Sequence, residues 1–413
     1  MRSHTPRRLG MTCAALAGAA LAAAGCASPS AAPGTGSTAG AAVKIGIITA
    51  ESGPYQPYGQ EYLQGLKAGL KYVTNGTNEI GGHKIDLIVD DDADSPTTAV
   101  NDAKTLIGQG VQIIGGTVDS AIALQVAAVA AQNKVLYVAG PAAVDQLDNL
   151  NRYTFRSGRE TYQDVATAGT FVGSLTGKKV VVLAQNSEFG TANVTAVQDV
   201  LGAKGATVSS VLVPPTATDF TPFSQQVLAA HPDMIFVAWA GTDATQLWDT
   251  LDQQGVLTST QVVTGLANTA TYPATGTAGS RIEFLAHYFP GAGGGNKYEK
   301  AMTSAVDKAG GTVDLFTPDG FTAAQMFARA IEASPTDVDA MIGALEGWSF
   351  AGVEGQYTVR ASDHALLQPE FQAKLTGSGT SWTPELVKTV PAQQIAPPPP
   401  ARPAWNAATK PGS

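Results

Sequence analysis

Cysteine is nearly absent from this chain of 413 residues, and its two copies, Cys13 and Cys26, both lie near the N-terminus. The body of the chain therefore has no pair of thiols that could form a structural disulfide. The five histidines are scattered, with no HExxH-type pair among them. Because cysteine and histidine are the usual zinc ligands, we expect neither a metal site nor a metal cofactor.

Signatures of catalysis are also missing. There is no G-x-S-x-G sequence, and the glycine-rich "GAGGGN" at 291–296 lacks the lysine and the strand-to-helix context of a phosphate-binding loop. The run "DDDADS" at 90–95 places acids as a calcium loop would, but Ser95 stands where glycine is needed and Asn101 where glutamate is needed. We favour a helix-capping role for this run. We expect no enzymatic activity and no cofactor.

Positive charge is scarce. The chain has 25 Lys and Arg and 34 Asp and Glu, which gives a formal net charge of −9. Removal of residues 1–25 would take away three arginines and no acid, which brings the charge to −12. Phosphate contacts need clustered Lys and Arg, so an acidic body argues against nucleic acid as a partner.

Long apolar runs are limited to the N-terminus, where residues 1–25 have the basic and apolar regions of a signal peptide. The segment ends in "LAAAGC", which resembles a lipobox and predicts lipidation at Cys26, although Ala23 occupies the position where leucine is typical. Ordinary cleavage is the alternative, and a twin-arginine reading of "PRRLGM" lacks the rest of its motif. Residues 26–42 are rich in small residues and predict a flexible tether. We expect an extracytoplasmic protein held to the membrane by a lipid anchor only.

Short β-branched runs alternate with helical patterns from Val43 onward. The runs at 43–49, 83–90, 111–116 and 134–140 predict strands, with helices between them. Ser95 and Pro96 are the expected N-cap and first residue of one of these helices. Continuous apolar strands joined by crossover helices indicate a parallel sheet that is covered on both faces. This part of the chain is predicted to be a doubly wound α/β lobe.

The pattern restarts after "RYTFRSGRETYQD". Strands are predicted at 178–184, 206–213, 233–240 and 260–265, again with helices between them, so a second α/β lobe is expected. A further strand at 280–289, helices at 296–310 and 319–334, and strand-like pieces at 349–361 complete the fold. The proline-rich residues 391–413 predict a disordered tail.

Several landmarks follow one another in a recognisable order: "ESGPYQPYGQEYLQGLKAGL", "IDLIVDDDADSPTTAVNDAKTLI", "IIGGTVDSAIALQVAAVAAQNKVLYVAGPAA", "TFRSG", "SEFG" and "TDF". In this order the chain resembles the branched-chain amino-acid family of ABC-transporter solute-binding proteins, from about Val43 to about His364. The resemblance implies a type I periplasmic-binding fold, with two doubly wound parallel-sheet lobes joined by three crossovers. We expect an N-terminal lobe of 43–158 plus 288–345 and a C-terminal lobe of 159–287 plus 346–390.

Ligands of open α/β sheets bind outside the carboxyl ends of the strands. In the first lobe this rule selects Tyr55 and Tyr58, the loop of Thr117 to Ser120, and the loop of Pro141 to Val144. In the second lobe it selects Phe189 and the turn after the strand at 233–240. The predicted ligand-binding residues are Tyr58, Asp119, Ser120, Ala142, Phe189, Trp239, Thr242 and Asp243. Each aromatic could instead be part of a core, and for Tyr55 and Phe321 we favour that role.

Carried over position by position, the resemblance is uneven. Phe189 replaces the family's usual tyrosine, and Asp119 stands where a serine binds the ligand carboxylate. Val144 replaces a threonine, and Leu266 falls where an acid accepts the ligand ammonium. A buried ammonium without a carboxylate partner is costly. Asp119 is either a helix N-cap or a cleft residue that would favour a cation or a hydroxyl-rich ligand.

The resemblance implies that the chain binds a small polar or aromatic metabolite, an amino acid or a related compound, distinct from leucine, isoleucine and valine. Its partners would be an ABC permease and its ATPase. The alternative is a ligand-sensing receptor that signals to a membrane partner. An adjacent transporter operon would favour the importer, and an adjacent histidine kinase gene would favour the receptor.

Overall fold

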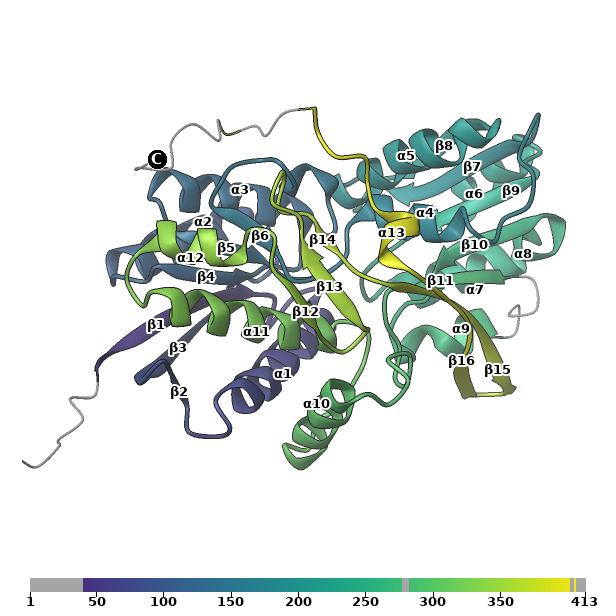
Figure 1. The fold of residues 1–413 in the computed structure, drawn as a ribbon. Coiled ribbons are helices and arrows are strands. Elements are labelled where there is room, and N and C mark those ends of the chain that lie inside the picture. The colour runs from purple at the N-terminus through teal and green to yellow at the C-terminus, as the bar shows by residue number, and fades with distance from the viewer. Residues whose placement is uncertain (1–39, 277–281, 402–404, 406–413) are drawn as a thin grey trace, which may run out of the picture. The chain divides into compact units, whose positions relative to one another are not determined.

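The computed structural model describes residues 40–276, 282–401 and 405. Within these ranges the chain forms two large sheets and one small sheet (Figure 1). The predicted signal peptide, the lipidation site Cys26 and nearly all of the predicted tether lie outside the described residues. No helix in the described ranges is long and apolar enough to cross a membrane.

The first sheet has the strand order β2-β3-β1-β4-β5-β6, with every pair parallel except β2 with β3. Its strands are β1 (Gly40–Thr49), β2 (Glu79–Ile80), β3 (His83–Asp91), β4 (Ile113–Gly116), β5 (Leu136–Ala139) and β6 (Thr154–Arg156). Side chains alternate between the two faces of β1. Ile45 and Ile47 pack with α1 (Gln56–Val73) and α11 (Thr317–Ala333) on one face. Ile48 packs with α2 (Pro96–Gly108) and α3 (Ser120–Gln132) on the other. The sheet is buried on both sides, as its uninterrupted apolar strands predicted.

Helices on both faces complete the first lobe, by which we mean the first sheet, the helices packed on it, and the helix at 297–308, which packs on α1. They are α1 (Gln56–Val73), α2 (Pro96–Gly108), α3 (Ser120–Gln132), α10 (Lys297–Lys308), α11 (Thr317–Ala333) and α12 (Val338–Leu345). The Ser95 hydroxyl accepts a hydrogen bond from the Thr98 N–H and Pro96 is the first residue of α2, which confirms the predicted cap.

The second sheet has the order β16-β15-β11-β10-β9-β7-β8. Its strands are β7 (Lys179–Gln185), β8 (Thr207–Val213), β9 (Met234–Ala238), β10 (Gln261–Gly265), β11 (Ile282–Ala286), β15 (Glu370–Ser378) and β16 (Ser381–Val390). Strands β7 to β11 are parallel to one another. At one edge β15 pairs antiparallel with β11, and β16 pairs antiparallel with β15.

The second lobe comprises this sheet and the helices on its two faces. Two helices pack on one face, α4 (Thr161–Ala168) and α5 (Glu188–Val200). Four pack on the other, α6 (Thr221–Ala229), α7 (Ala244–Gln253), α8 (Val256–Ser259) and α9 (Tyr272–Gly276). The architecture is thus the predicted α/β fold with two mostly parallel sheets.

Three crossovers join the lobes. The chain passes to the second sheet after β6, returns after β11, and passes again before β15. Before the third crossover it forms a small antiparallel sheet of β12 (Ser349–Ala351), β13 (Gln356–Val359) and β14 (Leu366–Leu367). Phe350, Tyr357 and Leu366 of this sheet belong to the core of the first lobe. We therefore retain the two-lobe division as a proposal and move residues 346–367 into the first lobe.

The first residues of the predicted tail are packed rather than loose. Ala392–Ile395 forms the short helix α13, which packs on α4, and the Ile395 side chain is buried. Arg360 Nη1 donates a hydrogen bond to the Pro397 carbonyl oxygen over 2.7 Å. Composition alone did not predict this, because the apolar Ile395 is a single residue in a proline-rich run.

Candidate functional site

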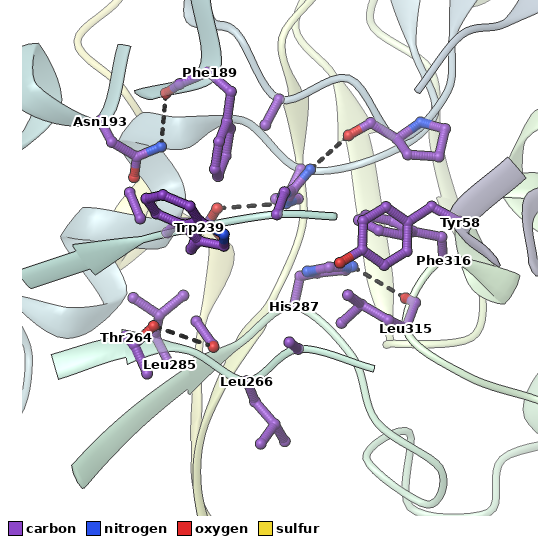
Figure 2. Close-up of a pocket in the computed structure, with 18 of the residues that line it drawn as sticks. Tyr58, Phe189, Asn193, Trp239, Thr264, Leu266, Leu285, His287, Leu315 and Phe316 are labelled. Carbon is purple, nitrogen blue, oxygen red and sulfur yellow. Dashed lines mark hydrogen bonds and ion pairs between the residues drawn. The ribbon is translucent and has the colours of Figure 1, made fainter. Parts of the chain in front are cut away.

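A cavity of about 90 Å³ lies at the carboxyl ends of strands from both sheets. A single water needs about 10–15 Å³ of such space, so the cavity has room for a molecule of several non-hydrogen atoms. Figure 2 shows Phe189 and Trp239 at one side of it and Tyr58 and Phe316 at the other. The cavity is therefore walled by aromatic rings from both lobes, as ligand pockets commonly are.

The first-lobe wall is built around Tyr58, which lies in the first turn of α1 and is 5% exposed. Its ring meets the Phe316 ring edge to face, with 5.0 Å between centroids. Its hydroxyl oxygen accepts a hydrogen bond from the Gly241 N–H of the second lobe over 3.2 Å. Phe316 is fixed in turn, because its N–H donates to Glu61 Oε2 over 3.0 Å. Tyr58 thus contacts both lobes at the pocket.

The second-lobe wall is built around Phe189 and Trp239. Phe189 lies in the first turn of α5, where the Ser187 hydroxyl caps the helix by accepting from the Gly190 N–H. Trp239 follows β9, and its Nε1–H donates to Asp243 Oδ1 over 2.9 Å. Both rings are half-buried, so each presents a face that a ligand can cover.

Part of the polar lining consists of side chains at the crossovers, and Asp119, Ser120, Asn193 and Thr264 supply the rest. Arg159 Nη1 donates to the Pro141 carbonyl oxygen over 2.6 Å, and Arg159 Nε lies 3.4 Å from Asp164 Oδ2. The Arg159 guanidinium also lies over the Phe316 ring, at 5.3 Å from its centroid. His287 Nε2 lies 3.0 Å from the Leu315 carbonyl oxygen. The Arg159, Asp164 and His287 side chains are buried.

Burial shifts the protonation of these groups. It lowers the pKa of His287 well below its ordinary value, and the Arg159 charge lowers it further, so the imidazole is neutral at pH 7. Burial raises the pKa of Asp164 to about 6, against the opposing charge of Arg159. Burial also raises the pKa of Tyr58 to about 12, so its hydroxyl stays protonated.

Five of the eight predicted ligand-binding residues line the cavity: Tyr58, Asp119, Ser120, Phe189 and Trp239. The other three do not. Ala142 is buried between two lining residues, Thr242 is exposed to solvent, and Asp243 acts through its bond to Trp239. The role of the lining residues in ligand binding stays a prediction.

Asp119 is the N-cap of α3 and also lines the cavity. Its Oδ1 accepts a hydrogen bond from the Ile122 N–H over 2.9 Å.

In the run at 90–95, the Asp91 carboxylate accepts from the Ser52 and Ala93 N–H groups, and Asp94 accepts from the Tyr55 N–H. No group of acids or histidines in the described ranges is arranged to hold a metal ion.

Sequence reasoning missed Arg159, His287, Leu315 and Phe316, which also line the cavity. His287 directly follows β11 and could have been found, since the carboxyl-end rule applies to that strand as well. Arg159 lies three residues after β6 and could have been found by the same rule. Phe316 precedes α11 and follows no sheet strand directly, so the rule does not select it.

A family model described as periplasmic binding protein matches residues 42–380. The Leu/Ile/Val-binding protein BraC3 of Rhizobium johnstonii is 26% identical over 316 residues, which are 74% of this chain and 83% of that protein.

Two solved structures from Rhodopseudomonas palustris share the fold. An ABC-type branched-chain amino acid transporter protein from strain CGA009 is 29% identical, with a TM-score of 0.71, and the match covers 86% of this chain and 99% of that one. A solute-binding protein of an ABC transporter from strain HaA2, in complex with p-hydroxybenzoic acid, is 22% identical, with a TM-score of 0.77, over 89% of this chain and 99% of that one. The chain belongs to the periplasmic binding protein family, whose members bind solutes for transport and are not enzymes.

Proposed function

We propose that this protein is the extracytoplasmic solute-binding lipoprotein of an ABC importer, anchored through Cys26, which delivers a small polar or aromatic metabolite to a membrane permease and its ATPase. The observation that carries the proposal is the cavity lined by Tyr58 and Phe316 on one side and Phe189 and Trp239 on the other. Flat aromatic walls from two lobes favour a ligand with a planar apolar body.

The comparisons support two parts of this ligand class. Solved structures of similar fold contain p-hydroxybenzoic acid or benzoate, which supports a planar ligand. Family relatives named for binding leucine, isoleucine and valine support an amino acid or a related compound. Leu266 is 3% exposed and lines the cavity, so the apolar residue predicted in place of the ammonium-accepting acid lies in the pocket wall. We therefore expect a ligand other than leucine, isoleucine or valine.

A thermal-shift screen tests the ligand class. Amino acids, amides, aromatic acids and polyamines are added one at a time, and a bound ligand raises the melting temperature by mass action. We expect stabilisation by at least one aromatic or polar compound. In Tyr58→Ala and Phe189→Ala variants that still fold, the shift should shrink or vanish. Stabilisation of the wild type by leucine alone, or equal shifts in both variants, would contradict the proposal.

The lipid anchor is tested separately. The full chain and a Cys26→Ala variant are expressed in a bacterial host, and their membrane and soluble fractions are compared together with the mass of the mature N-terminus. Acylation and membrane recovery that depend on Cys26 are expected. A mature chain cleaved elsewhere, without acylation, would show ordinary secretion instead.

A further inference from the structure

Arg159 places a buried positive charge at the cavity. The residue is 7% exposed, and its Nη1 donates a hydrogen bond to the Pro141 carbonyl oxygen. Its Nε lies 3.4 Å from Asp164 Oδ2, as an ion pair without a hydrogen bond. Nη2 has no partner among the described residues. Stacking on the Phe316 ring holds the guanidinium plane in place. A guanidinium fixed in this way has a donor available for an anionic ligand group, and such a bond is stronger in a dry site than in water.

The acids of the lining do not provide an equivalent place for an ammonium group. Asp164 is already next to Arg159, and burial raises its pKa to about 6. Asp119 caps α3 and is half-buried, so solvent screens its charge. At the predicted ammonium position, Leu266 offers only an apolar side chain. A zwitterionic amino acid would find a partner for its carboxylate but would leave its ammonium without one, which is costly in a buried site.

His287 gives the pocket a second preference, for a ligand group that donates a hydrogen bond. A carbonyl oxygen can only accept, so the Nε2 atom next to Leu315 must carry the hydrogen. Since the ring is neutral, its Nδ1 bears a lone pair and can only accept a hydrogen bond. His287 lines the cavity, and Nδ1 has no partner in the described part of the chain. A ligand hydroxyl could donate to this atom.

We propose that the ligand of this pocket is an aromatic carboxylate without an ammonium group, whose carboxylate is bound by Arg159. The inference rests on the proposed function and narrows its ligand class. It assigns the aromatic ring to the walls formed by Tyr58, Phe316, Phe189 and Trp239, and gives a ring hydroxyl, where present, an acceptor in His287.

The test is calorimetric titration of the wild type with compounds that share one ring and differ in charge: benzoate, benzamide, benzylamine and phenylalanine. Benzoate should bind at least about 10-fold more tightly than benzamide, as expected for a charge-assisted hydrogen bond. Phenylalanine and benzylamine should bind more weakly than benzoate. Equal affinity for benzamide, or tightest binding of phenylalanine or benzylamine, would overturn the proposal.

Variants of the protein test the role of Arg159 itself. Arg159→Met should weaken benzoate binding by about 10- to 100-fold and change benzamide binding far less. The matched control is Arg152→Met, because Arg152 is a partly exposed arginine outside the cavity lining that pairs with Asp339. Equal losses for benzoate and benzamide would also overturn the assignment. If Arg159→Met does not fold, the wild-type series decides alone.

The two proposals fail in different ways. If no aromatic acid binds but another compound stabilises the protein, the inference is wrong and solute binding stands. If no compound of the full screen binds, the proposed function itself fails.

Discussion

At the scale of single residues, Tyr58 has a role in addition to lining the cavity. Its hydroxyl oxygen accepts from the Gly241 N–H across the two lobes, so the bond exists only while the lobes are together. Tyr58→Phe keeps the ring and leaves that buried N–H unpaired, at a cost of about 1–3 kcal/mol. We expect ligand affinity to fall by about 10-fold with little change in the melting temperature of the free protein.

The measurement is calorimetry on Tyr58→Phe beside a control, Tyr153→Phe. Tyr153 is half-buried, and no hydrogen bond of its hydroxyl was found among the described residues. Unchanged affinity in Tyr58→Phe would show that the bond to Gly241 does not contribute to the bound state.

Asp319 makes stability depend on pH. This carboxyl lies in α11, faces Arg156, Arg159 and Asp164, and is 1% exposed. Burial raises its pKa from 3.8 to about 8. Between these values the folded chain keeps a proton that the unfolded chain has released. The free energy of unfolding therefore falls as the pH rises through this window, by about 1.4 kcal/mol per pH unit for one such group.

Asp319→Asn removes this titration, since the amide is always neutral. Relative to wild type, the variant should gain stability steadily from pH 5 to pH 8 in denaturant unfolding. Asp339→Asn, at an exposed carboxyl, is the control. Parallel pH profiles of wild type and Asp319→Asn would contradict the assignment. Buried Glu160, Glu354 and Glu370, whose pKa values are also raised by burial, add to the wild-type slope in the same direction.

These residues show what the sequence can and cannot predict about the site. Tyr58, Phe189 and Trp239 could be predicted because each closely follows a strand of a parallel sheet, where ligands bind. Arg159 follows β6 and was open to the same rule, whereas Phe316 follows no sheet strand directly. The contact between these two residues could not be predicted, because they are 157 positions apart in the chain and meet only when the crossovers are folded. Thr242 was wrongly expected in the lining, since the turn after β9 exposes it to solvent.

At the scale of elements, α1 and α11 position two of the pocket rings, Tyr58 and Phe316. Their backbones touch at two glycines. A Cβ added to Gly65 would lie 1.8 Å from the Thr317 carbonyl oxygen, and one added to Gly320 would lie 1.9 Å from the Tyr62 carbonyl oxygen. Only glycine allows this approach, so an alanine at either position must push the helices apart.

We expect Gly65→Ala and Gly320→Ala each to lower the free energy of unfolding by about 1–3 kcal/mol or more, the usual cost of overpacking. Gly343→Ala is the matched control: it lies in α12, with nothing within 4 Å of its added Cβ. A helical alanine there should be neutral or stabilising by up to about 1 kcal/mol. Equal effects at all three glycines in urea unfolding would contradict this account of the packing.

The elements themselves were largely predictable. Uninterrupted apolar strands and amphipathic helices gave the predicted alternation, and Ser95 with Pro96 marked a helix start. The short helix α13 and the three-stranded sheet of β12, β13 and β14 were harder, because their segments are too short for periodicity to indicate where they pack.

At the scale of the whole molecule, contacts between the lobes surround the cavity. Besides the bond from Gly241 to Tyr58, the Thr269 N–H donates to Asp314 Oδ2 over 3.0 Å, from the loop after β10 to the start of α11. A ligand that touches Tyr58 and Phe189 together would add to these contacts. Solute binding by this protein therefore requires that a small molecule lies between rings from both lobes.

The most direct test is a crystal structure of the protein with the compound that stabilises it most in the screen. The account predicts electron density for that compound between the Tyr58 and Phe189 rings, with its acidic group at Arg159. Density for the compound at any other place, with the space between these rings empty, would contradict it.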